Sequence, residues 1–228
     1  MNGIYGMAAT GLNNDSSFAV NEAVAKIGAQ GEERTAMTLN GFGLKAAVLH
    51  DLRVPIPGFK SNIDHIIVSG KRVLVLDTKV WKPGFYWTLA GKNRRGTERI
   101  KHTEKDVAYL QAALITYLRG TGATITLPHL VIWPSSTHAK ISFWLLRVPG
   151  ASRLLHGTAL LGFTKRFITR APADPVITAK LAALCMKKTQ PATAQAAVPR
   201  QGPGSAYDDS FDSAPSRKFT PAGPSPFN

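Results

Sequence analysis

Two aspartates and a lysine lie in the most apolar part of the chain. Asp64 belongs to the stretch NIDHIIVS at residues 62–69, and Asp77 and Lys79 belong to RVLVLDTKVW at residues 72–81. Both stretches have the β-branched and aliphatic composition of buried strands, where an unpaired carboxylate is costly. A chain that keeps two carboxylates there needs a cation to compensate their charge.

The Gly70-Lys71 pair between these stretches predicts how the side chains meet. A two-residue hairpin loop pairs residues whose numbers sum to 141, as 70 and 71 do, so Asp64 lies opposite Asp77. Lys79 shares their face, because strand side chains alternate with a period of two. A three-residue loop would shift the register by one and place the two aspartates on opposite faces.

Two kinds of cation could compensate the carboxylates, and each predicts a different role. Mg²⁺ prefers oxygen ligands and is commonly held by one or two carboxylates together with a phosphate. Held by Asp64 and Asp77, it could activate water for attack on a phosphodiester, while Lys79 orients that water or stabilises developing negative charge. Alternatively, both aspartates are structural and either pair with Lys79 or cap strand ends.

The distribution of acidic residues narrows the choice of site. There is no Asp or Glu between Asp106 and Asp174, so a carboxylate-dependent site must draw on the first half of the chain. Of the acidic residues there, we expect only Asp64 and Asp77 to lie within strongly apolar strands. The full set is Asp15, Glu22, Glu32, Glu33, Asp51, Asp64, Asp77, Glu98, Glu104 and Asp106.

The elements around this pair predict a mixed α/β fold. Helical composition over 16–42, with Ser16 or Ser17 as the cap, precedes the strands and stops at Gly41 and Gly43. Apolar residues at helical spacing predict a long helix over 97–120 that crosses the sheet, and Asp174 followed by proline predicts a last helix over 174–188. The remaining predicted strands cover 46–55, 84–91, 127–134, 140–150 and, as a short one, 158–163.

The formal net charge of +14 indicates a polyanionic partner, with nucleic acid favoured over membrane. From residue 190 onward the charges cancel, so the predicted folded part carries the whole excess. A solvated basic surface is the alternative. No zinc finger, helix-turn-helix or RNA-recognition signature accompanies the basic residues, so we expect phosphate contacts without sequence readout. The basic turn that precedes the long helix is predicted to supply them through Lys92, Arg94, Arg95, Arg99 and Lys101.

Composition also indicates in which cellular compartment the protein lies and how its domains are arranged. No run of about 18 apolar residues and no secretory leader is present. This predicts a soluble, cytoplasmic protein that has no membrane partner. The lone Cys185 excludes an internal disulfide framework and a cysteine-rich zinc site. We expect a helical extension at 1–27, a catalytic-size domain at 28–189, and a disordered tail rich in proline, serine and alanine at 190–228.

Three stretches resemble the nuclease-related domain, NERD. This family is a branch of the restriction-endonuclease-like PD-(D/E)xK superfamily, whose members carry an Asp followed by a strand with an (Asp/Glu)-x-Lys motif. The resemblance covers roughly residues 28–135. The stretches are GE at 31–32, NIDHIIVSGKRVLVLDTKVW at 62–81 and ERIKH at 98–102.

The resemblance implies a mixed β-sheet flanked by helices and a site built around Mg²⁺ or Mn²⁺. It implies that Glu32 joins Asp64 and Asp77 as a metal ligand and that Lys79 is the catalytic lysine. His102 stands where the family commonly has the glutamine of an Asn-Pro-x-x-Gln element. It therefore either bonds a phosphate or the attacking water, or is an exposed residue of the helix start.

The leading functional hypothesis is a metal-dependent nuclease that hydrolyses phosphodiester bonds in DNA. The second is a catalytically inactive DNA-binding module of a plasmid or mobile-element system, which would bind DNA without metal. A weaker third hypothesis is a scaffold whose tail at 190–228 recruits protein partners.

Overall fold

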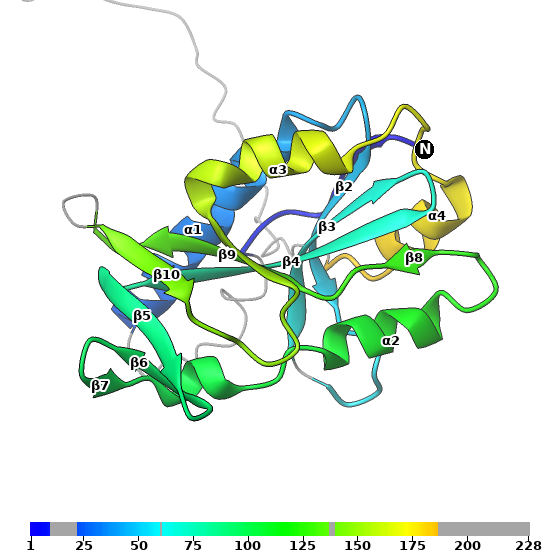
Figure 1. Cartoon of the computed structure of the whole chain (residues 1–228). Coiled ribbons are helices and arrows are strands. Elements are labelled where there is room, and N and C mark those ends of the chain that lie inside the picture. The colour runs from blue at the N-terminus through cyan, green and yellow to red at the C-terminus, as the bar shows by residue number, and fades with distance from the viewer. Residues whose placement is uncertain (10–21, 60, 137–139, 187–228) are drawn as a thin grey trace, which may run out of the picture. The chain divides into compact units, whose positions relative to one another are not determined.

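The apolar stretches of the chain form a mixed β-sheet. The computed structural model describes residues 1–9, 22–59, 61–136 and 140–186, so Ser16, Ser17 and the predicted tail lie outside the described residues. Within these ranges the main sheet has seven strands in the order β1-β2-β3-β4-β9-β11, with β8 pairing β4 (Figure 1). They are β1 Gly3–Tyr5, β2 Ala47–Arg53, β3 Asn62–Ser69, β4 Arg72–Trp81, β8 Thr124–Ile125, β9 His129–Pro134 and β11 Arg153–His156.

The predicted hairpin register is confirmed. β3 and β4 are antiparallel, with Ser69 opposite Arg72 and His65 opposite Leu76, so paired residue numbers sum to 141. Gly70 takes a left-handed φ of 57° in the two-residue turn, a conformation that glycine adopts without steric cost. On its other edge β4 pairs in parallel with β9, which makes β4 a central strand.

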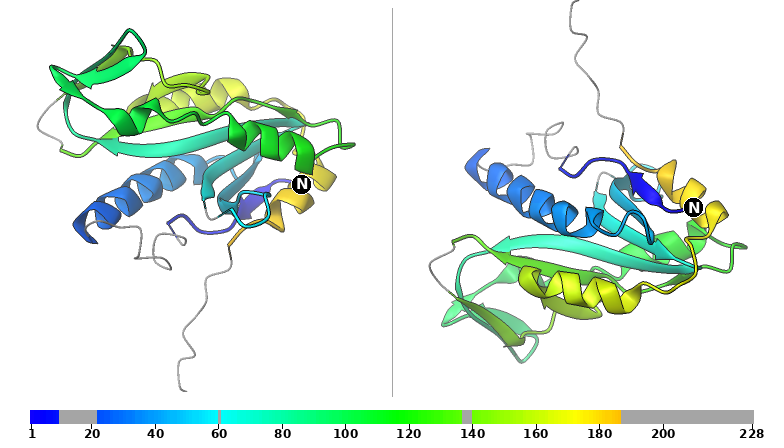
Figure 2. Two further views of the ribbon diagram at one scale, coloured as in Figure 1. Left: turned by 90° about the horizontal axis from the view of Figure 1, so that it is seen from below. Right: turned by 90° about the horizontal axis from the view of Figure 1, so that it is seen from above.

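Helices flank both faces of this sheet, as predicted. α1 Glu22–Asn40 and α3 Leu160–Phe167 share an apolar cluster with Ile67 and Leu74. The alternate side chains, including Ile66 and Val75, pack against α2 Tyr109–Tyr117 and α4 Pro175–Ala182. Figure 2 shows α1 and α2 on opposite sides of the β4 ribbon. None of the helices in the described part of the chain is long and apolar enough to cross a membrane.

A second, four-stranded sheet is formed within the described ranges by the basic segment and its neighbours. Its order is β10-β5-β6-β7, with β5 Gly84–Leu89, β6 Lys92–Arg95, β7 Glu98–Arg99 and β10 Ile141–Leu145 (Figure 1). One face of it packs on the main sheet, where Tyr86 and Phe143 join Trp81 and Ile132 in an apolar cluster. The predicted basic turn is therefore a pair of short strands.

The prediction of one long helix over 97–120 is wrong. The segment instead contains a 3-10 helix, η3 Lys101–Glu104, and only then α2. The backbone N–H of Val107 donates to Pro149 O at 3.1 Å, and that of Ala108 donates to the Asp106 carboxylate at 2.7 Å. Because these groups bond outside a helix, the α-helical ladder cannot start before this point.

One further local prediction was wrong, and two others were right. The expected strand over 158–163 is η4 Gly157–Ala159 followed by α3, in which Leu160, Thr164 and Phe167 are buried at helical spacing. The helical composition expected over 16–42 is present as α1 Glu22–Asn40, which runs without a break across residue 27. The Asp174 cap of α4 is confirmed by bonds from two backbone N–H groups.

Candidate functional site

Asp77 and Lys79 form an ion pair on one face of β4. Lys79 Nζ lies 2.7 Å from Asp77 Oδ2, and the side chains are 42% and 11% exposed, respectively. Desolvation opposes the charge of Lys79, but the Asp77 and Asp64 carboxylates outweigh it and raise the lysine pKa. The ammonium is therefore held in its charged form beside the carboxylates.

Asp64 lies beside this pair, where the β3-β4 ladder ends. The ladder ends at the pair of His65 with Leu76, and beyond it Asp64 Oδ2 accepts the backbone N–H of Thr78 at 2.6 Å. Desolvation raises the pKa of Asp64 well above its ordinary value, and the negative charge of Asp77 raises it further. The predicted convergence of Asp64, Asp77 and Lys79 is thus present in the structure.

Glu32 reaches the same site from α1. Its Oε2 accepts the backbone N–H of Ala9 at 3.1 Å. Desolvation and the charge of Asp51 raise its pKa to about 7, although Lys79 acts in the opposite direction. Electrostatic interaction with both Lys79 and Asp77 shows that this helix carboxylate belongs to the same charge cluster as the strand residues.

The raised pKa of Glu32 predicts a pH dependence of stability. Between its ordinary value of 4.5 and about 7, the folded state retains a proton that the unfolded state has released. This contribution is fully present below the unfolded pKa and is lost as pH rises through that window. Glu32→Gln removes the ionisation, so we expect its free energy of unfolding, relative to that of the parent, to be larger at pH 8 than at pH 5.

Urea unfolding of parent and variant at both pH values measures this difference. Glu33→Gln is the control for loss of a charge from α1, because Glu33 is the exposed neighbour of Glu32. A Glu32→Gln difference that is the same at pH 5 and pH 8 would contradict the expectation.

Gly31 allows α1 to approach β4 closely enough to deliver Glu32. A Cβ at residue 31 would lie 2.3 Å from Val80 Cγ2, well inside van der Waals contact. At Gly162 in α3 the nearest atom to an added Cβ is Arg166 Nη1 at 3.9 Å. The packing of α1 therefore requires glycine at residue 31, whereas the packing of α3 does not require glycine at residue 162.

This contrast predicts opposite effects of the same substitution. Gly162→Ala should stabilise the protein by about 0.5–1 kcal/mol, because alanine favours helix interiors. Gly31→Ala should instead lower the free energy of unfolding by about 1–3 kcal/mol, as overpacking does. Urea unfolding of both variants measures this, and a Gly31→Ala variant as stable as the parent would show that α1 does not depend on the close approach.

Asp51 is a member of the charge cluster that the sequence analysis missed. It is buried at 4% exposure in β2, its φ is 51°, and its Oδ1 accepts a hydrogen bond from Asn62 Nδ2 at 2.9 Å. His50 and Leu52 pair with His65 and Ile63, so Asp51 lies level with Asp64 across the sheet. The expectation that only two acidic residues lie in apolar strands was wrong, and the composition of 46–55 was the available signal.

The chemistry of this cluster fits a hard divalent cation. Asp77 Oδ2 is buried, and the Lys79 ammonium 2.7 Å away compensates its charge. An oxygen in that state is suited to coordinate a metal ion. Among the described residues, no three His, Cys, Asp or Glu side chains are already arranged as a metal site.

The predicted phosphate-binding residues lie on the small sheet and η3, and several have local partners. Arg95 pairs with Glu98, Arg99 Nη2 lies 2.9 Å from Glu104 Oε2, and Arg94 Nη1 donates to Thr97 O at 2.8 Å. Lys92 and Lys101 are exposed. His102 lies in η3, but its side chain is outside the described residues.

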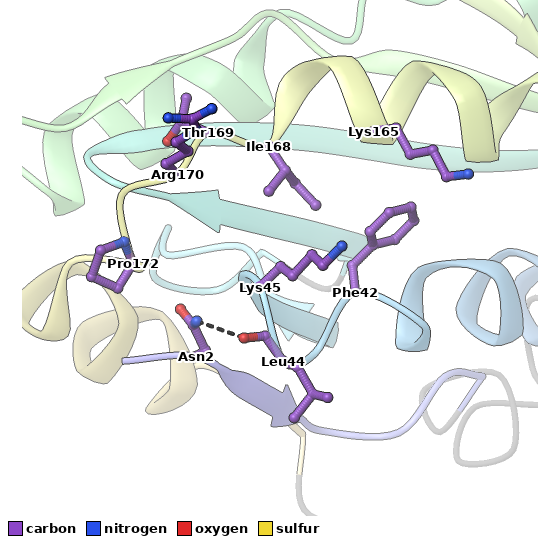
Figure 3. A pocket seen from close by; sticks show the side chains of 9 residues that line it. All are labelled: Asn2, Phe42, Leu44, Lys45, Lys165, Ile168, Thr169, Arg170 and Pro172. Carbon is purple, nitrogen blue, oxygen red and sulfur yellow. Dashed lines mark hydrogen bonds between the residues drawn. The ribbon is translucent and has the colours of Figure 1, made fainter.

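Two basic hollows lie elsewhere on the molecule. Figure 3 shows Lys45 and Phe42, which follow α1, facing Lys165 and Ile168 across a hollow of about 560 Å³. Another, of about 610 Å³, has Arg72, Arg153 and Arg166 among its lining residues. No Asp or Glu lines either hollow, so both could hold phosphate but neither contains the carboxylate cluster.

Comparison with known protein families gives a match over the part of the chain that carries these residues. The family model described as nuclease-related domain, NERD, matches residues 27–134, a range that contains Glu32, Asp64, Asp77 and Lys79. No curated protein and no solved structure was found to match the chain. Residues 27–134 of this chain thus match the nuclease-related domain that the sequence motifs predicted.

Proposed function

We propose that this protein is a metal-dependent nuclease that hydrolyses phosphodiester bonds in DNA. The observation that carries the proposal is the convergence of Asp64, Asp77, Glu32 and Lys79 at the end of the β3-β4 ladder. Four ionisable side chains from one helix and two strands are costly to gather in a partly buried position. The raised pKa values of Glu32, Asp64 and Lys79 are typical of functional sites.

In this proposal Asp64 and Asp77 hold Mg²⁺ or Mn²⁺, with Glu32 as a third ligand. The bound ion would supply an activated water and stabilise charge on the phosphate. Lys79 keeps its proton at neutral pH and places a positive charge 2.7 Å from Asp77 Oδ2, where it can orient the water or stabilise phosphate oxygens. Thr78 N–H fixes the Asp64 carboxylate through its hydrogen bond.

The charge of the whole protein supports a polyanionic substrate. The net charge is +14, and the two hollows described above gather lysines and arginines without carboxylates. Such surfaces attract DNA through its phosphates and make binding sensitive to salt. These contacts read no base sequence, so we expect cleavage without strong sequence preference.

One observation favours a second candidate, an inactive DNA-binding module. The Lys79 ammonium already compensates Asp77, and Asp64 already accepts the backbone N–H of Thr78 in β4. In that arrangement both aspartates would serve the fold. The module would bind DNA equally well with or without a divalent ion.

A cleavage assay with a binding arm separates the two candidates. Purified protein is incubated with supercoiled plasmid in Mg²⁺, in Mn²⁺ and in EDTA, and conversion to nicked, linear or degraded DNA is followed on a gel. The nuclease predicts conversion only with a divalent ion. Intact plasmid in every condition, together with an EDTA-resistant gel shift, would establish the binding module instead.

A further inference from the structure

The small sheet has an outer face that carries aromatic rings. Along β5, Tyr86 is buried at 3% exposure against the main sheet, so Phe85 and Trp87 point to the opposite side. Phe85 is 40% exposed. Trp87 is held in place by a hydrogen bond of 2.8 Å from its Nε1 to Gly96 O.

β10 extends this aromatic surface. Trp144 is 76% exposed, and its ring centroid lies 6.3 Å from that of Phe85 at a tilt of 49°. Phe143, the preceding residue, is buried in the cluster between the two sheets. Leaving a tryptophan so exposed is unfavourable in water, so the pair is a candidate contact surface.

Cations lie beside these rings on the same face. Directly paired residues of antiparallel strands project to the same side, and Trp87 pairs with Arg94 and Leu89 pairs with Lys92. Arg94 in turn pairs with Arg99 on β7. The outer face, defined here as Phe85, Trp87, Trp144, Lys92 and Arg94, therefore combines aromatic rings with positive charge.

We propose that this outer face binds single-stranded nucleic acid. Bases stack on Phe85 and Trp144, while Lys92 and Arg94 contact the phosphates. Aromatic rings interspersed with cations suit single strands, because the faces of unpaired bases are accessible and those of a duplex are stacked on each other. A purely apolar protein interface would not require the neighbouring lysine and arginine, and charge complementarity favours the polyanion.

The outer face lies next to the carboxylate site along the chain. Residues 82 and 83 separate β4, which carries Asp77 and Lys79, from β5. Trp81 at the end of β4 stacks on Tyr86 of β5, with centroids 5.0 Å apart, and so joins the two sheets. The inference rests on the proposed nucleic-acid substrate and adds that its strand is unpaired where it leaves the site.

Fluorescence anisotropy of labelled DNA tests the inference without requiring cleavage. The full chain is titrated, in EDTA, into an oligothymidylate of about 20 nucleotides and into a duplex of equal length. Trp144→Ala and Phe85→Ala should each raise Kd for the single strand by about 5- to 10-fold, and change Kd for the duplex by less than about twofold. Both side chains are exposed, so neither substitution should unfold the protein.

Phe59→Ala is the matched control. Phe59 is 43% exposed and pairs with Tyr109 at 5.2 Å, yet it lies outside the small sheet. An equal loss of affinity for single-stranded and duplex DNA would overturn the inference. So would unchanged affinity for the single strand in Trp144→Ala and Phe85→Ala. So would loss of self-association in Trp144→Ala with unchanged DNA affinity, which would identify a protein interface. The titration is carried out in EDTA and so does not depend on cleavage. The single-strand inference can therefore fail while the protein still cleaves plasmid, and it can hold while the protein cleaves nothing.

Discussion

Asp77→Asn is expected to reduce metal-dependent plasmid cleavage by at least about 100-fold, the size of effect seen when a group that stabilises a transition state is removed. Asparagine keeps the shape of the side chain but removes the negative charge that attracts a divalent ion. It also removes the ion-pair partner of Lys79, whose Nζ lies 2.7 Å from Asp77 Oδ2. The initial rate of loss of supercoiled plasmid in Mg²⁺ measures the effect.

A thermal shift separates loss of metal binding from loss of fold. Mg²⁺ should raise the melting temperature of the parent, because a ligand that binds only the folded state stabilises it. Asp77→Asn should retain the parent's near-UV circular dichroism but lose this shift. Glu33→Gln, in an exposed acidic residue of α1, should keep both the shift and the cleavage rate. If Asp77→Asn cleaves within about twofold of the parent, the assigned role of Asp77 is wrong.

The central hairpin was predictable because its information is local. Two apolar stretches separated by Gly70-Lys71 define the loop, and a two-residue loop then sets every pair from Ser69–Arg72 to His65–Leu76. The shared face of Asp77 and Lys79 follows from alternation alone. The position of Glu32 beside them could not be derived in this way, since it depends on how α1 docks on the sheet, and only the family resemblance indicated it.

The errors arose where distant contacts determine the local structure. The start of α2 is delayed by the bond from Val107 N to Pro149 O, which joins residues far apart in the sequence. β1 and β11 have only three and four residues and exist through parallel pairing with β2 and β9. Such short strands have no periodicity that a single sequence reveals.

Asp51 shows the same limit within the site. Its residue type and apolar neighbours were visible in the sequence, but its left-handed φ of 51° and its bond from Asn62 were not. The register of β2 against β3 places it level with Asp64. Its charge contributes to the raised pKa of Glu32, so one residue omitted from the sequence prediction helps to set the protonation of another that was included.

Lys79→Met is expected to separate catalysis from metal binding. The substitution removes the ammonium and keeps a long apolar side chain, so cleavage should fall by about 100-fold or more, as when charge stabilisation of a transition state is lost. At neutral pH this lysine is charged in the folded and unfolded states, because its folded pKa is raised above the ordinary value. Its stabilising interaction with the carboxylates is therefore fully present at pH 8 and is lost on substitution.

Magnesium should stabilise Lys79→Met more than it stabilises the parent. Without the ammonium, Asp77 and Asp64 repel each other, as do Asp77 and Glu32, and a divalent cation can take over the compensation of Asp77 Oδ2 that Lys79 supplied. Parent, Lys79→Met and Asp77→Asn are compared by melting temperature across a Mg²⁺ titration at pH 8. A larger shift in Lys79→Met, none in Asp77→Asn and cleavage by neither would assign metal binding to the aspartate and chemistry to the lysine. A Lys79→Met variant that Mg²⁺ leaves unstabilised would show that the carboxylates serve the ion pair alone.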